Sequence, residues 1–178
     1  MPASPAASRR RRAHRSVLMI GSEGVPFSKT GGLADMAAAL ARSLARAGTR
    51  VSLVTPLHRG IRERFPTLKH FDYQLDLPLG ATRVQAQVQH LAWMPGLDVY
   101  FIEQPALFDR KELYQVEGES YADNAARFVF LSKCVAQMAR YLPARPDIVH
   151  AHDWQTALVP LLMLHQKWRE GWGSSTSD

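Results

Sequence analysis

The feature that most restricts the fold of this chain is a short apolar run that leads through a glycine-marked loop into a helical pattern. The apolar residues at 17–20 stop at Gly21, as a buried strand of a parallel sheet does. Further apolar residues then recur at helical spacing, and these are Leu33, Met36, Ala37, Leu40 and Leu44. A strand, a loop and a helix in this order predict the start of a βαβ unit, and hence a parallel sheet covered by helices.

The loop between this strand and this helix has the chemistry of an anion site. Lys29, Gly31 and Gly32 fall at the helix start, where free N–H groups and the positive end of the helix dipole favour a phosphate or diphosphate. Two glycines can equally serve a tight turn, and a loop lysine can simply be solvated. The residue order matches neither the Walker loop nor the glycine pattern of dinucleotide-binding folds.

The remaining sequence continues the alternation of strands and helices. Gly48 is expected to stop the first helix, and 50–56 to form the second strand. The alternating segments 71–77 and 83–91 predict an antiparallel hairpin, followed by a strand at 99–102, a helix at 121–142, a strand at 147–152 and a helix at 154–168. The predicted fold class is α/β: a Rossmann-like parallel sheet with flanking helices and an antiparallel hairpin excursion.

Charge and composition divide the chain into one domain and two tails. Five of the six net positive charges come from arginines in the first 15 residues, so nucleic acid is expected to meet only this tail, without specificity. We expect a disordered basic tail at 1–15, a domain at 16–168 and a flexible tail at 169–178. No apolar run reaches membrane-spanning length, and the single cysteine, Cys134, reads as a buried core residue in a reducing cytosol.

A second group of polar and aromatic residues follows the strand expected at 147–152. Period-two geometry places His150 and His152 on the same side, but no third ligand is evident nearby, and we expect no metal. Asp153 beside the ring of Trp154 suits sugar hydroxyls, although Asp153 could instead cap a helix. Because this segment and the glycine loop both follow strands at the same edge, we expect them to line one cleft.

Four blocks of residues together resemble bacterial glycogen synthases and plant starch synthases, which are retaining glucosyltransferases that use ADP-glucose. The blocks are residues 29–35 preceded by Ser22-Glu23, residues 107–110, residues 121–124 with Arg127-Phe128, and residues 150–156. The resemblance covers about 16–168 and implies the N-terminal half of a GT-B fold, in which two Rossmann-like domains face each other. It also implies ADP-glucose as donor, an α-1,4-glucan as acceptor, and no cofactor.

The resemblance assigns roles to matching positions of this chain. Lys29 would hold the ADP phosphates, and Gly31 and Gly32 would bring backbone amides to the donor. The resemblance also implies four residues that would face the glucosyl group or the acceptor glucan, namely Glu23, His152, Asp153 and Trp154. Asp35 belongs to the first block, yet as an acid in the first helical turn it could serve only the helix dipole.

This chain departs from the family after its last block. Family members continue into a strand ending in a Thr-Val-His-Asn-like segment and then into a second domain, which supply a catalytic histidine and further donor-binding Arg, Lys and Glu residues. We therefore expect the chain to be inactive or nearly so alone, or to act with a separately encoded C-terminal domain. The expected location is a bacterial cytoplasm, with a plastid as the alternative because the acid-free, Arg-containing start resembles part of a transit peptide.

The sequence leaves other functions open. The chain could be a non-catalytic module that binds glucan or nucleotide, or one half of a split enzyme. A nicotinamide-dependent oxidoreductase on a similar sheet is disfavoured, because the glycine fingerprint is missing and no acidic residue closes the second strand.

Overall fold

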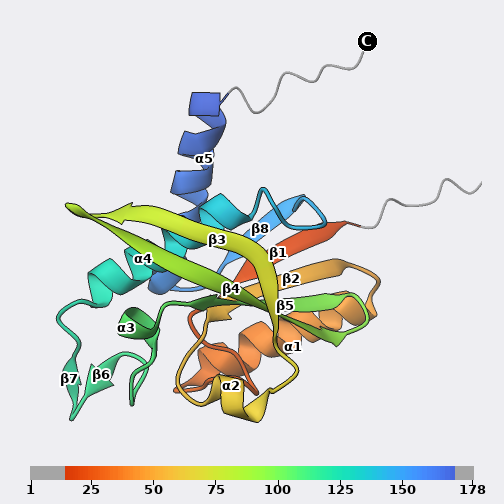
Figure 1. Ribbon diagram of the computed structural model, residues 1–178. Coiled ribbons are helices and arrows are strands. Elements are labelled where there is room, and N and C mark those ends of the chain that lie inside the picture. Colours follow the sequence, from red (N-terminus) through yellow and green to blue (C-terminus); the bar gives the residue numbers. More distant parts are fainter. Residues whose placement is uncertain (1–14, 171–178) are drawn as a thin grey trace, which may run out of the picture.

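The computed structural model describes residues 15–170, and it describes side chains as far as Gln166 (Figure 1). The tails expected at 1–15 and 169–178 lie almost entirely outside these residues. In chain order the elements are β1 Ser16–Ile20, α1 Gly32–Arg46, β2 Arg50–Pro56, α2 Ile61–Arg64, β3 Lys69–Leu79, β4 Thr82–Met94, β5 Leu97–Glu103, α3 Pro105–Phe108, β6 Gln115–Val116, β7 Glu119–Ser120, α4 Asn124–Met138, β8 Ile148–Ala151, the 3-10 turn η1 Trp154–Thr156, and α5 Val159–Glu170.

One central sheet organises the molecule, with strand order β3-β4-β5-β2-β1-β8 (Figure 1). The strands β5, β2, β1 and β8 are parallel, whereas β3 and β4 form an antiparallel hairpin that joins the sheet through β5. The hairpin turns between Leu79 and Thr82, where Gly80 has a positive φ of 62°. The expected α/β class, with its parallel sheet and antiparallel excursion, is confirmed.

Helices cover both faces of the sheet, and this explains why β1 is apolar from Val17 to Ile20. Leu18 and Ile20 pack in a cluster with residues of α4 and α5, whereas Val17 and Met19 pack on the opposite face with residues of α1. Because successive side chains of a strand point to opposite faces, a strand covered on both sides buries both sets of side chains, which favours apolar residues at every position.

The helix α1 was predicted correctly, but its buried face is different from the one suggested by its larger apolar residues. Its buried residues are all alanines, namely Ala34, Ala37, Ala38, Ala41 and Ala45. Met36 is 46% exposed, while Leu40 and Leu44 pack at the margin of the cluster. Small side chains let the helix backbone lie close to the sheet, so the larger side chains fill only the edges.

Two helical predictions need correction at their ends. The helix expected at 121–142 is shorter, because α4 runs only from Asn124 to Met138. The helix expected at 154–168 is divided into η1 and α5, and α5 begins at Val159. Pro160 explains the break, since proline fits the first turn of a helix but would clash with the carbonyl of Thr156 inside a continuous one. None of the helices within 15–170 combines the length and hydrophobicity needed to cross a bilayer.

Candidate functional site

A buried aromatic side chain anchors the loop that follows β1. Phe27 is 1% exposed, and its ring lies 4.9 to 5.0 Å from the rings of Phe65, Trp93 and Phe101. The Phe27 amide donates to the Gly24 carbonyl at 2.9 Å. These contacts fix the backbone two residues before Lys29.

The buried side chain of Glu23 joins the two ends of the same loop by hydrogen bonds. It is only 3% exposed, and its carboxylate accepts hydrogen bonds from the Thr30 amide and, at 3.0 and 3.1 Å, from the Thr30 hydroxyl. The carboxylate therefore positions the residue directly before Gly31. The role that the resemblance implies for Glu23 toward a sugar stays a prediction.

The two glycines at the start of α1 face open space. Gly31 is the N-cap with an extended backbone (φ −151°, ψ −162°), and no side chain caps the helix there. A Cβ atom added to Gly31 or Gly32 would meet no atom within 4 Å, and neither residue has a positive φ. The fold itself does not require glycine at these positions, which weakens the tight-turn alternative. A ligand that approaches the helix start closely gives glycine a reason to be there.

Lys29 lies before this helix start and pairs with Asp35 in the first turn of α1. The distance from Lys29 Nζ to Asp35 Oδ2 is 2.7 Å, and the two side chains are 52% and 55% exposed. An exposed pair of this kind contributes no more than about 1 kcal/mol. A phosphate group at the helix start could therefore replace Asp35 as the partner of Lys29.

Positive charge also surrounds a cavity of about 280 Å³ beside Lys29, between the 25–29 loop and residues 110–113. Its charged lining residues are Lys29, Arg59, Arg64, Arg110 and Lys111, and no carboxylate lines it. Arg59 pairs with Asp109 at 2.6 Å, whereas Arg64 donates to backbone carbonyls of the loop. The surroundings of Lys29 thus favour an anion electrostatically.

His150 lies in β8, the other neighbour of β1, and His152 follows this strand directly. The β8 strand pairs with β1, and the His152 amide donates to the Ile20 carbonyl at 3.0 Å. The rings of His150 and His152 lie 4.1 Å apart at 30°, which confirms that they share one side. His152 is 5% exposed, and burial, followed by the nearby His150, lowers its pKa. Within 15–170, no group of three or more His, Cys, Asp or Glu residues could hold a metal ion.

Asp153 and Trp154 occupy the turn that follows. Asp153 has a positive φ of 65°, and its Oδ1 accepts a hydrogen bond from the Trp154 amide at 2.7 Å, so it caps η1. Trp154 is 54% exposed and rests edge-on against Phe128 at 5.1 Å. An exposed indole held in place by a second ring remains available to a sugar face.

Tyr114 links the two segments, and sequence reasoning missed it. Its hydroxyl lies 2.6 Å from Ser22 Oγ. Burial raises the pKa of Tyr114 to about 12, and the negative charges of Glu23 and Asp153 add to this effect. The Tyr114 ring also lies 5.8 Å from the ring of Phe128, against which Trp154 rests, so Tyr114 reaches the turn after β8 through Phe128. Its only signal in the sequence is its place between two of the family blocks.

The family of this chain follows from its sequence. A model of the starch synthase catalytic domain matches residues 16–175. The chain belongs to the starch synthase catalytic domain family.

Relatives of known name support this assignment to the starch synthase family. The chain is 42% identical over 150 residues to glycogen synthase 1 of Geobacter metallireducens, covering 83% of this chain and 30% of that protein. It is 43% identical over 155 residues to the glycogen synthase of Bordetella petrii, covering 85% of this chain and 29% of that protein. This chain therefore spans about 30% of the length of these relatives.

A solved structure of the starch synthase family has the same fold. The catalytic domain of starch synthase IV from Arabidopsis thaliana, bound to ADP and acarbose, matches with a TM-score of 0.72 and 26% sequence identity. The match covers 89% of this chain and 32% of that chain. The fold similarity thus extends over nearly the whole of the domain in this family member.

His58, which follows β2, is a further buried contact of the site in this starch synthase family member. It is 5% exposed, and its Nε2 lies 2.8 Å from the Ser22 carbonyl oxygen. Burial lowers the pKa of His58 to about 4. The ring is therefore neutral at pH 7 and can donate to Ser22, which ties the loop after β2 to the loop after β1.

The low pKa of His58 predicts a stability that depends on pH. Between pH 6.5 and 4 the unfolded chain binds a proton that the folded chain excludes, so stability is lost as the pH falls through this window. We expect the free energy of unfolding to fall by ~2 kcal/mol from this group between pH 7 and pH 5. Urea unfolding of the native chain and of His58→Gln, which keeps an N–H donor, measures the difference. An equal fall in both proteins would contradict the assignment to His58.

Proposed function

We propose that this chain is the N-terminal, donor-binding part of a retaining glucosyltransferase that moves glucose from ADP-glucose to the non-reducing end of an α-1,4-glucan. The observation that carries the proposal is the start of α1, where Lys29 precedes two glycines that the fold does not require. The named relatives are glycogen synthases, and the starch synthase IV structure was solved with ADP.

In this proposal the residues of the loop divide binding and positioning between them. Lys29 attracts the diphosphate, and the uncapped N–H groups of the first turn of α1 point toward it. Glu23 holds Thr30 and so fixes the backbone that leads into Gly31. As the bond from glucose to the diphosphate breaks, negative charge grows on the leaving group, and these groups stabilise it where it develops.

On the opposite side of the proposed cleft lie residues that can bind the sugar. Asp153 and the exposed ring of Trp154 follow the strand next to β1, where a carboxylate and an aromatic face can meet hydroxyls and an apolar sugar surface. His152, adjacent to them, has a buried Nε2 without a hydrogen-bond partner among the described residues. A substrate hydroxyl is the kind of group that such an atom can bind.

A chimaera tests this function. Residues 16–168 would replace the corresponding segment of Geobacter metallireducens glycogen synthase 1, and transfer from ADP-glucose to glycogen would be measured. We expect activity that falls at least ~100-fold when Lys29 is replaced by Ala, since removal of one charge-stabilising donor costs about this much. A folded chimaera that binds ADP or glucan without any transfer would favour the non-catalytic binding module.

The same assay tests a separately encoded C-terminal partner. Such a partner would be added to the 178-residue chain in place of the relative's C-terminal segment.

A further inference from the structure

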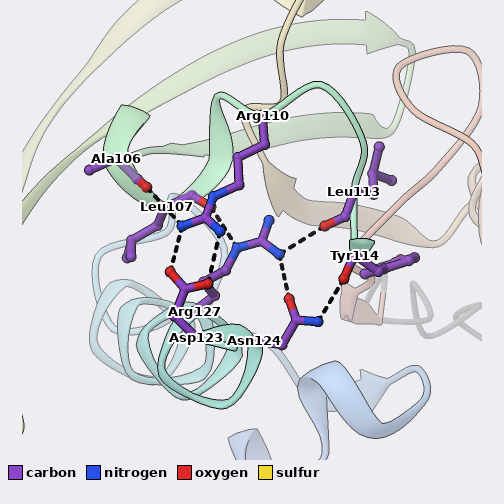
Figure 2. A network of polar contacts seen from close by, with 8 residues as sticks. All are labelled: Ala106, Leu107, Arg110, Leu113, Tyr114, Asp123, Asn124 and Arg127. Atoms are coloured by element: carbon purple, nitrogen blue, oxygen red, sulfur yellow. Dashed lines mark hydrogen bonds and ion pairs between the residues drawn. The ribbon is translucent and has the colours of Figure 1, made fainter. Parts of the chain in front are cut away.

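A single buried side chain holds the loop 107–114 against α4. Arg127 is 0% exposed, and its Nε donates to the Leu107 carbonyl at 2.6 Å. Its Nη1 donates to the Leu113 carbonyl at 2.9 Å and to Asn124 Oδ1 at 2.6 Å (Figure 2). One planar guanidinium therefore fixes both ends of this loop relative to α4.

The contacts continue from this loop to the proposed donor site. Asn124 Nδ2 donates to the Tyr114 carbonyl at 2.7 Å (Figure 2), and the Tyr114 hydroxyl lies 2.6 Å from Ser22 Oγ. Ser22 directly precedes Glu23, whose carboxylate binds Thr30. An unbroken path of hydrogen bonds and adjacent residues thus connects α4 to the residue before Gly31.

Stability alone does not account for an arginine at position 127. No carboxylate of the described chain lies within ion-pair distance of it, and its Nη2 is buried without an acceptor among the described residues. The guanidinium lies 5.2 to 5.7 Å from the rings of Phe108, Tyr121 and Phe128. These rings attract the guanidinium and offset part of the cost of burying an unpaired charge, a cost that an apolar side chain would avoid altogether. What an apolar side chain cannot do is hold two carbonyls in one plane.

We propose that Arg127 is a positioning residue of the donor site, which acts by fixing the loop 107–114 so that Tyr114 braces Ser22 and the loop leading to Gly31. The positioning itself depends only on the contacts described above. Its consequence for nucleotide affinity rests on the proposed function. The two parts are therefore tested by separate measurements.

Amide hydrogen exchange in the 178-residue chain tests the positioning. The reporter is the Thr30 amide, which donates to Glu23, and the reference is the Leu53 amide in the central strand β2. In Tyr114→Phe, which loses only the hydroxyl, and in Arg127→Gln we expect Thr30 to exchange roughly tenfold faster while Leu53 is unchanged. The double variant should exchange no faster than Arg127→Gln, because both changes interrupt one path.

Two matched variants separate positioning from general destabilisation. Arg110 lies on the same loop, but it binds Asp123 and the Ala106 carbonyl, outside the path (Figure 2). Arg110→Gln removes one tie between this loop and Asp123 but leaves every contact of the path in place, so it should accelerate Thr30 exchange less than Arg127→Gln does. Arg127→Lys should behave like Arg127→Gln, because an ammonium group cannot bind both loop carbonyls in the fork geometry. The proposal is overturned if Tyr114→Phe leaves Thr30 unchanged, or if Arg127→Lys accelerates Thr30 and Leu53 equally.

The consequence for the ligand is measured as ADP affinity by calorimetry. We expect Arg127→Lys and Tyr114→Phe each to weaken ADP binding several-fold. Lys69→Ala, which changes an exposed lysine on β3, is the control and should leave ADP affinity unchanged. Faster Thr30 exchange with undiminished ADP affinity would overturn the consequence for the donor site. Absence of ADP binding by the native chain would instead count against the proposed function, and the exchange result would still decide the positioning.

Discussion

The 178-residue chain alone should release no ADP from ADP-glucose above the level of its Lys29→Ala variant. The resemblance places the catalytic histidine and several cationic donor-binding residues in parts of the family sequence that have no counterpart in these 178 residues. Loss of one group that stabilises developing charge lowers the rate by about 10²- to 10³-fold, so the loss of several leaves no measurable turnover.

A coupled ADP-release assay with ADP-glucose and glycogen measures this. The glycogen synthase 1 of Geobacter metallireducens, 42% identical over the matched segment, is the positive control under the same conditions. A rate within ~100-fold of that relative, lost in Lys29→Ala, would show that the N-terminal domain carries the chemistry by itself and would contradict the expected dependence on a second domain.

Replacement of Phe27 by Ala should produce the largest loss of stability among the site residues. The ring is buried in contact with three other aromatic rings under the glycine loop. Truncation of a buried Phe removes apolar contacts and leaves a cavity, at a cost of about 3–5 kcal/mol. Since a domain has only about 5–15 kcal/mol of net stability, urea unfolding should show a much lower midpoint.

Two control variants define what the Phe27 result means. Phe27→Leu retains most of the apolar volume and should cost less than Phe27→Ala. Leu164→Ala removes a side chain that is 50% exposed on α5, and it should change stability by no more than ~0.5 kcal/mol. If Phe27→Ala were no more destabilising than Leu164→Ala, the loop would not be anchored through this ring.

Elements governed by local pattern could be predicted from the sequence. The βαβ start, the hairpin and the parallel strands follow from hydrophobic period and from turn residues such as Gly48 and Gly80. The shared side of His150 and His152 follows from the period of two in a strand. The placement of Lys29 before the first helix likewise needed only the order of strand, loop and helix.

Contacts between distant residues could not be predicted in this way. Tyr114 meets Ser22 across 92 positions, and His58 meets Ser22 across 36. Local periodicity does not encode which loops meet at one edge of the sheet, nor which side chains lie between those loops. The buried alanine face of α1 was also hidden, because larger apolar residues dominate a helical pattern even when small ones pack closest to the sheet. The break before α5 had a visible signal in Pro160.

ADP binding by the 178-residue chain, followed by calorimetry, is the most direct test of the central claim that Lys29 and the glycine start of α1 form a diphosphate site. We predict that Lys29→Ala weakens binding at least ~tenfold. Gly32→Ala should also weaken it without loss of stability, because a Cβ there meets no protein atom within 4 Å. Lys69→Ala, an exposed lysine on β3, should bind ADP like the native chain. Equal ADP affinity in the native chain, Lys29→Ala and Gly32→Ala would contradict the account.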